Sequence, residues 1–224
     1  MSRILAYCAF LEDGKLSLPS TGVNQAPVHV LEHDGLRWLW SEVEWPFEQG
    51  SLQRNALEFH EVVKHVFLQT AVAPFRLLSV FETYDALKSF AAGHRREFAA
   101  DLERLRDFVQ MESVIYVIAP RIQPESSSGR AYLERRAELA RAVEEHTAAV
   151  RDAVAKVSND VRVRDTRNGK RIFALVQRGA EEKFRLAVEQ VALSGQISRR
   201  MSGPWPAAEF LSQEVKTPQT VEQP

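Results

Sequence analysis

The chain has a single cysteine and no long hydrophobic run. Cys8 has no partner for an internal disulfide among the 224 residues, so a reducing, cytosolic setting is expected. The apolar stretch in MSRILAYCAFLEDG is too short for a signal peptide, and no run approaches the roughly 20 residues of a membrane-spanning helix. We therefore expect a soluble cytoplasmic protein in which Cys8 is a small buried hydrophobe.

The chain also has almost no net charge and lacks the common catalytic motifs. The 29 Lys and Arg and 30 Asp and Glu leave a net charge of −1, which gives no general attraction to nucleic acid or to an anionic membrane. No glycine-rich phosphate loop and no G-x-S-x-G nucleophile elbow is present. His60 and His65 are five residues apart, so on a helix they would point about 140° away from each other. The sequence predicts no catalytic residues, no cofactor and no metal, and therefore not an enzyme.

What the sequence does contain is the composition of a globular protein. Hydrophobic residues make up 45% and charged residues 26%, and the length allows one large domain or two small ones. The first half predicts, in order, a strand at residues 4–10, two strands around a tight turn at Asp34-Gly35, a helix at 52–68, a strand at 72–81 and a long helix at 84–107. The helix at 52–68 is indicated by the helical spacing of Leu52, Ala56, Phe59, Val63 and Val66.

The second half has a more regular order. It predicts a strand at residues 111–120, a loop at 123–129, a helix at 130–157, a hairpin centred on Asn168-Gly169 with positive φ angles, a helix at 180–193 and a strand at 196–202. The order β-α-β-β-α-β is that of ferredoxin-like domains. We predict an α+β protein with a related, irregular α+β domain at residues 1–110, a ferredoxin-like domain at 111–211 and a disordered tail at 212–224.

One strand of the second half has features of the RNA recognition motif. KRIFALVQ combines basic residues with Phe173, and further arginines lie in the same hairpin at 162, 164 and 167. That motif needs several aromatic side chains on which bases stack, and here Phe173 alone is suitable. We expect Phe173 to face Arg164 across the hairpin in a structural stack. An RNA-binding module is kept as an alternative, with nucleic acid an unlikely partner.

The folded part ends with an unusual segment, SGPWPAAEFL at residues 202–211. Pro204 and Pro206 restrict their own backbone angles and those of the preceding residues, so Trp205 should be held in a stiff extended strip. Two hypotheses remain open. In the first, which we favour, the last strand stops at Pro204 and Trp205 folds back as a plug for the core. In the second, the strip is a recognition surface.

SGPWPAAEF resembles the terminal signature of the GvpF/GvpL family of gas vesicle proteins, usually Gly-Pro-Trp-Pro-Pro-Tyr-Ser-Phe. Four weaker blocks follow the family in the expected order: LRWLWSEVEWP, FHEVVKHVFLQTAVAPFRLLSVFET, GRAYLERR and FALVQRGAEEKFRLAVEQV. The resemblance implies that the residues of the family signature either have a structural role or contact a partner. These signature residues are Gly203, Pro204, Trp205, Pro206, Phe210, Gly129, Tyr132, Pro74 and Phe75. Ala207, Ala208 and Glu209 depart from the pattern, and so does the leucine that replaces a glycine at 77 or 78.

The resemblance implies a function that composition does not. Members of the family are accessory or minor structural proteins of gas vesicles that associate with a small, very hydrophobic shell protein and are needed for vesicle formation. The expected partners are the shell protein and other gas vesicle accessory proteins, and the expected location is the cytoplasm and the gas vesicle. A stand-alone adaptor that binds another protein is the alternative.

Overall fold

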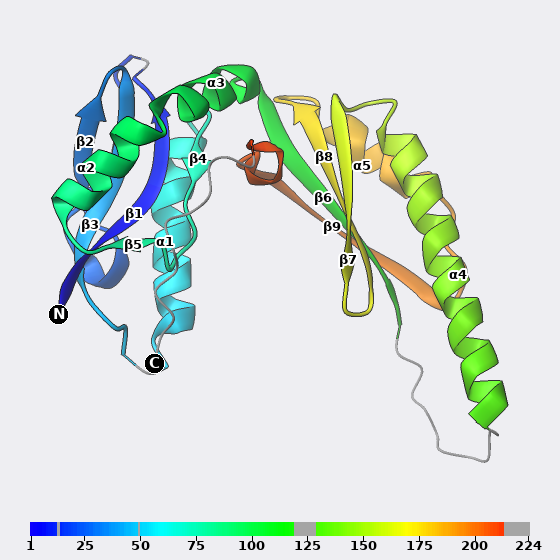
Figure 1. The fold of residues 1–224 in the computed structure, drawn as a ribbon. Coiled ribbons are helices and arrows are strands. Elements are labelled where there is room, and N and C mark those ends of the chain that lie inside the picture. Colours follow the sequence, from blue (N-terminus) through cyan, green and yellow to red (C-terminus); the bar gives the residue numbers. More distant parts are fainter. Residues whose placement is uncertain (13, 49, 119–128, 213–224) are drawn as a thin grey trace. The chain divides into compact units, whose positions relative to one another are not determined.

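The computed structural model describes residues 1–12, 14–48, 50–118 and 129–212, and it divides the chain into two compact units (Figure 1). The first unit is Met1–Asp107 together with the chain from Pro206 onward, and the second is Phe108–Trp205. The sequence predicted one boundary near residue 110, with residues 111–211 in the second domain. In the structure, the chain instead leaves the first unit once and returns to it after Trp205.

The first unit is an antiparallel sheet with helices packed against it. Its elements are β1 (Ser2–Leu11), the 3₁₀ turn η1 (Val23–Gln25), β2 (His29–His33), β3 (Leu36–Glu44), α1 (Leu52–Phe67), β4 (Ala73–Pro74), β5 (Val80–Phe81), α2 (Tyr84–Gly93), α3 (Arg95–Leu105) and the 3₁₀ turn η2 (Ala208–Phe210). The strands are ordered β2-β3-β1-β4, with β5 also paired to β1. The predicted hairpin turn at Asp34-Gly35 is confirmed, because β2 ends at His33 and β3 begins at Leu36.

Aromatic side chains make up much of the core of the first unit. Trp38 of β3 packs against Phe98 of α3, with ring centroids 4.5 Å apart, and Phe75 and Phe90 complete the cluster. Tyr7 of β1 packs against Phe59 of α1 at 5.2 Å. Cys8 is buried beside Tyr7, as predicted, so β1 runs through the centre of this core.

Two predicted features of the first unit are wrong in detail. The long helix at 84–107 is two helices, because Gly93 favours helix less than other residues and His94 has non-helical angles (φ −112°, ψ 12°), with its backbone N–H bonded to the carbonyl of Phe90. The strand at 72–81 is split into β4 and β5 by a turn in which Ser79 N–H donates to Arg76 O at 2.9 Å.

A further difference concerns the buried face of α1. Leu52 and Ala56 belong to the helical apolar pattern but are exposed, whereas the polar side chain of Asn55 is buried. The Nδ2 of Asn55 donates to Ser51 Oγ at 3.1 Å, which gives the amide nitrogen a partner. Hydrophobic periodicity does not detect a buried position that is satisfied by a hydrogen bond.

Burial of Tyr7 and Cys8 predicts a loss of stability at high pH. Burial raises the pKa of the Cys8 thiol and that of the Tyr7 phenol above their ordinary values of 9.0 and 10.0. Above about pH 9 the unfolded chain releases these protons before the folded chain does, so the free energy of unfolding falls by up to about 1.4 kcal/mol per pH unit for each group. Urea unfolding between pH 8 and 10.5 should show a shallower decline for Cys8→Ala than for wild type. Equal slopes would contradict the assignment to Cys8.

The second unit has the predicted ferredoxin-like order. Its elements are β6 (Phe108–Val117), α4 (Gly129–Val154), β7 (Asp160–Thr166), β8 (Gly169–Gln177), α5 (Glu181–Glu189) and β9 (Ile197–Trp205). The antiparallel sheet has the order β7-β8-β6-β9, and α4 and α5 lie on the same side of it (Figure 1). The first unit repeats this order with its own strands, second-third-first-fourth, which agrees with the related layer predicted for it.

The hairpin of the second unit turns one residue earlier than predicted. The turn residues are Arg167-Asn168, neither has a positive φ, and Gly169 is already the first residue of β8. A Cβ on Gly169 would lie 2.9 Å from both Ile115 C and Tyr116 Cα and closer still to Ile115 O, so glycine is needed for close approach. The register shifts by two residues, and Phe173 consequently pairs with Arg162 and not with Arg164.

Two further predictions concern segments at the limits of the structure. Residues 123–128 of the predicted loop and residues 213–224 of the predicted disordered tail lie outside the described residues. Ser212, which was assigned to the disordered tail, is hydrogen-bonded in the first unit. The helix predicted at 130–157 ends at Val154. Over the described ranges, none of the helices combines the length and the hydrophobicity needed to span a membrane.

Candidate interaction surfaces

The histidines and carboxylates do not form a catalytic or metal site in the part of the chain that the structure describes. No group of three or more His, Cys, Asp or Glu side chains there is suited to hold a metal ion. His65 lies on the exposed side of α1, with its Nε2 3.1 Å from the carbonyl oxygen of Ser17. His60, five residues earlier, is half-buried. His65 therefore helps to hold the loop before η1 against α1.

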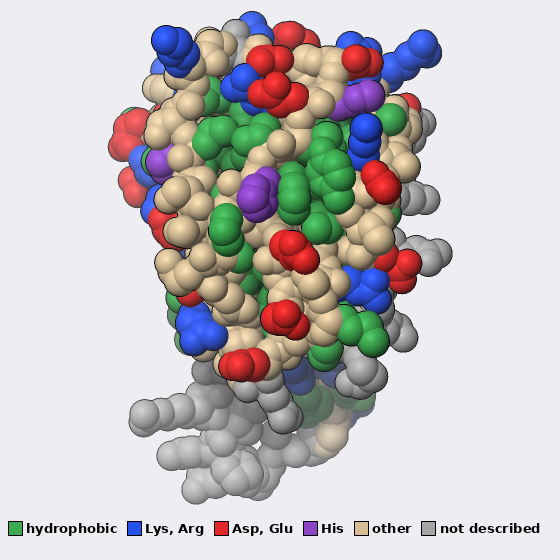
Figure 2. Space-filling view, turned by 90° about the vertical axis from the view of Figure 1, so that its left-hand side faces the viewer, with side chains coloured by type: hydrophobic (Ala, Val, Ile, Leu, Met, Phe, Trp, Pro, Cys, Tyr) green, Lys and Arg blue, Asp and Glu red, His purple; other side chains and the backbone are tan. Residues whose placement is uncertain are grey.

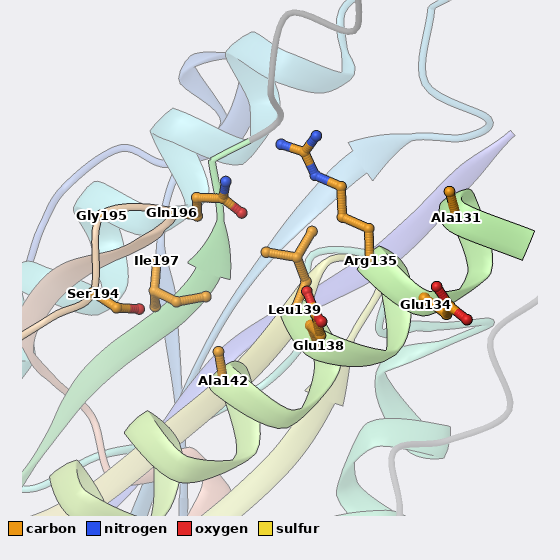
Figure 3. Close-up of a pocket in the computed structure, with 10 residues that line it drawn as sticks. All are labelled: Ala131, Glu134, Arg135, Glu138, Leu139, Ala142, Ser194, Gly195, Gln196 and Ile197. Atoms are coloured by element: carbon orange, nitrogen blue, oxygen red, sulfur yellow. The ribbon is translucent and has the colours of Figure 1, made fainter. Parts of the chain in front are cut away.

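A groove of about 530 Å³ lies in the second unit between α4 and the residues that precede β9. Leu139 and Arg135 extend from α4 toward the segment Ser194–Ile197 (Figure 3). His146 holds that segment, because its Nε2 accepts a hydrogen bond from Ser194 N–H at 3.0 Å while its Nδ1 lies 2.6 Å from Ala142 O. The polar part of its lining consists of Glu134, Arg135, Glu138, Ser194 and Gln196, so the groove is largely polar and charged.

The signature residues Gly203, Pro204 and Trp205 form the end of β9. Because β9 is an edge strand, Pro204 leaves no ladder hydrogen bond unmade. Gly203 has φ +117°, and a Cβ there would lie 2.8 Å from Met111 Sδ and 2.9 Å from Gln110 O, so the bulge between Ser202 and Trp205 requires glycine. Trp205 is half-buried and pairs with Gln110, and its Nε1 donates to Ser202 Oγ at 3.3 Å. The last strand thus continues to Trp205 and does not stop at Pro204.

The residues after Trp205 supply the buried side chains of the signature. Phe210 is 1% exposed and Ala207 is 5% exposed, and both belong to the first unit. Arg104 of α3 donates to the carbonyl of Phe210 at 2.7 Å. The signature therefore combines a strand of the second unit with a plug in the first, and the side chain that fills a core is Phe210 more than Trp205.

A buried carboxylate fastens this plug. Asp101 of α3 is 4% exposed, and one of its oxygens accepts hydrogen bonds from the backbone N–H and the Oγ of Ser212 at 2.7 and 2.8 Å. Its other oxygen accepts from Arg104 at 2.6 Å. A buried charge is tolerated only when it is paired and hydrogen-bonded, and Asp101 meets that condition through Arg104 and Ser212.

The remaining signature residues are not gathered at one place. Pro74 lies in β4 opposite Cys8, and Phe75 packs in the aromatic cluster around Trp38. Gly129 begins α4, and Tyr132 lies in its first turn with 53% of its surface exposed. Pro74 and Phe75 thus have structural positions, whereas Tyr132 is available to a partner.

An apolar surface that the sequence analysis did not identify lies on the first unit. His29 of β2 stacks on Trp40 of β3 with centroids 4.6 Å apart, and Trp40 lies 5.3 Å from Tyr84 at the start of α2. We call His29, Trp40 and Tyr84 the aromatic row. Hydrophobic side chains gather near the middle of the face shown in Figure 2, on the side of the unit that carries β2 and α2. The sequence held a signal for the pair, since His29 and Trp40 are equally far from the Asp34-Gly35 turn.

Comparisons with known proteins agree with this architecture. The family model described as gas vesicle synthesis protein GvpL/GvpF matches residues 3–212. No curated protein sequence matches the chain. The fold is similar to the crystal structure of the gas vesicle protein GvpF from Anabaena sp. PCC7120, with a TM-score of 0.76 at 15% identity over 95% of this chain and 97% of that one.

A second solved structure supports the same fold. GvpF from Microcystis aeruginosa superposes with a TM-score of 0.74 at 15% identity, covering 94% of this chain and 99% of that one. Both structures extend over the two units, so the arrangement of elements is shared along the chain. Because the family model covers nearly its whole length, the chain belongs to the GvpL/GvpF family of gas vesicle proteins.

Proposed function

We propose that this protein is a non-enzymatic accessory protein of gas vesicle formation that binds the hydrophobic shell protein during assembly, in the cytoplasm and at the growing vesicle. Membership of the GvpL/GvpF family supports the process, because the family is described by gas vesicle synthesis. The apolar surface on the first unit supports the mode of action. Other gas vesicle accessory proteins are further expected partners.

The observation that carries the proposal is the exposure of side chains at both ends of the aromatic row. Tyr84 is 40% exposed, and His29, on the edge strand β2, is exposed as well. Tyrosine offers a large apolar area with a polar end and loses little conformational freedom, which makes it a frequent anchor at protein interfaces. An apolar surface of this kind is suited to a hydrophobic partner.

The physical role follows from the chemistry of such a partner. A very hydrophobic shell subunit exposes apolar area before it assembles, and that area drives aggregation. A protein that covers it reversibly lowers the concentration of free subunit and delays premature association by mass action. Binding alone is sufficient for this role, so no catalytic group is required.

The proposal predicts a binding defect without a folding defect. We expect the double variant His29→Ser/Tyr84→Ser to capture purified shell protein about tenfold less well than wild type, because two exposed aromatic contacts of one surface are removed. Its melting temperature should change little, since both side chains are partly in water. The matched control is Leu133→Ser/Leu186→Ser, which alters two exposed leucines of the second unit.

Two results would count against this assignment. Equal capture by wild type and the His29/Tyr84 variant would remove the aromatic row from the proposal. Failure of wild type to capture shell protein at all would favour the alternative of an adaptor for another protein. In a gas vesicle gene cluster, the gene for the shell protein should lie beside the gene for this chain.

A further inference from the structure

The sheet of the second unit has one face covered by helices and one face without a helix. The β6 residues Val109, Met111 and Ile115 are fully buried on the side of α4 and α5. The alternate β6 residues Glu112 and Val114 point to the other side, because successive side chains of a strand alternate. We call this other side the open face.

Three arginines form a row across the open face. Arg164 of β7 is directly opposite Arg171 of β8, Arg171 is opposite Val114 of β6, and Val114 is opposite Arg200 of β9. We call Arg164, Arg171 and Arg200 the arginine row. Residues that are directly opposite in neighbouring strands share a face, so the three side chains project from the same side of the sheet. Arg164 and Arg200 are exposed.

This arrangement places like charges side by side on a face that also carries two carboxylates. Like charges directly opposite across two strands are destabilising. Glu112 lies 3.7 Å from Arg171 Nη1, and Asp160 lies 3.5 Å from Arg162 Nε. Against these two carboxylates the face carries four arginines. Because the whole chain has a net charge of −1, the excess is a local feature and not a consequence of composition.

We propose that the arginine row binds an acidic segment of a partner protein. Exposed arginines offer forked donors that bind carboxylates through two parallel hydrogen bonds, and a row of them matches carboxylates spaced along an extended chain. An anionic partner also relieves the repulsion between Arg164 and Arg171. This surface is on the second unit, so the inference does not depend on shell-protein binding at the aromatic row.

The aromatic residues of the open face favour a protein partner over RNA. Phe173 is buried, and the guanidinium of Arg171 lies 5.9 Å from its ring centroid, so that ring face is occupied. Two other aromatic residues of this face, Tyr116 and Trp205, are far from each other. Trp205 pairs with Gln110, and Tyr116 lies six residues further along β6, which corresponds to about 20 Å along the strand. Consecutive bases need closer stacking platforms than this.

The test uses the full chain and two acidic probes, fluorescent poly-L-glutamate and a mixed-sequence RNA oligonucleotide. We expect wild type to bind poly-L-glutamate at 50 mM NaCl and much less at 300 mM, because salt screens exposed charges. Arg164→Gln/Arg200→Gln should bind at least about tenfold more weakly, since two charged hydrogen-bond donors are lost. The control Arg151→Gln/Arg185→Gln removes the same charge from α4 and α5 and should bind within about twofold of wild type.

A thermal melt of each variant separates binding from folding. Arg164→Gln/Arg200→Gln should melt close to wild type, because both side chains are exposed and exposed ion pairs contribute little to stability. No binding of poly-L-glutamate by wild type, or equal losses in the two double variants, would overturn the proposal. A melting temperature lowered by several degrees in Arg164→Gln/Arg200→Gln would show that the arginine row stabilises the fold and would contradict its assignment as a binding surface. Tighter binding of the RNA through the same arginines would replace the protein partner with a nucleic acid.

Discussion

Phe210→Ala is expected to lower the free energy of unfolding by about 3–5 kcal/mol, the range for removal of a fully buried large aromatic. Phe210 is 1% exposed and fills the first unit, although it follows the second unit in the sequence. Its loss leaves a cavity beside α3 and weakens the segment that Arg104 and Asp101 hold. Urea unfolding monitored by circular dichroism measures the change.

Trp205→Ala is the matched comparison within the same signature. Trp205 is half-buried at the end of an edge strand, so its removal should cost clearly less than that of Phe210. This ranking reverses the plug hypothesis drawn from the sequence, which assigned the larger cost to Trp205. If Trp205→Ala proves the more destabilising of the two, the plug lies in the second unit after all.

Gly169→Ala is expected to destabilise the second unit by about 3 kcal/mol, near the top of the usual range for overpacking, because no rotamer moves a Cβ away from the backbone. The added atom would lie 2.9 Å from Ile115 C and Tyr116 Cα, and β8 would have to separate from β6 to relieve the contact. The sequence-based reason for this glycine, a positive φ angle, is wrong, since Gly169 has none. The expected loss of stability in Gly169→Ala therefore comes from the lack of space between β6 and β8.

Gly195→Ala provides the control for this prediction. Gly195 lies in the same unit, has open space around its Cα and lacks a positive φ, so alanine there should change the unfolding free energy by less than about 0.5 kcal/mol. Equal melting temperatures of the Gly169→Ala and wild-type proteins would show that β6 and β8 are farther apart at this point than the structure has them.

Local chemistry in the sequence was sufficient for much of the fold. The Asp34-Gly35 pair specified a hairpin, and alternating apolar segments specified the β-α-β-β-α-β order of the second unit. Both are properties of neighbouring residues, which is why they can be read without tertiary contacts. The SGPWP segment also pointed to the correct family through residue identity alone.

Other predictions failed where particular side-chain contacts or a distant part of the chain decide the outcome. The helix predicted at 84–107 breaks at His94, where the ring stacks on Phe90 with centroids 4.2 Å apart, and the buried Asn55 donates a hydrogen bond to Ser51. Both contacts are local, but a pattern of apolar residues does not contain them. The hairpin of the second unit turns at Arg167-Asn168 because Gly169 must pass the Ile115 backbone. That contact lies more than fifty residues away in sequence, so no local pattern contains it.

For the candidate surfaces as well, some features could be predicted from the local sequence and others were determined only by the tertiary structure. From the sequence alone came the family signature, including Gly203, Pro204 and Trp205, because its residue types are distinctive over a few positions. The register of the strands decided the rest. A shift of two residues opposes Arg164 to Arg171, and the return of the chain after Trp205 makes Phe210 part of the first unit. Side-chain neighbours across a sheet are set by backbone pairing, and only the tertiary structure determines that pairing.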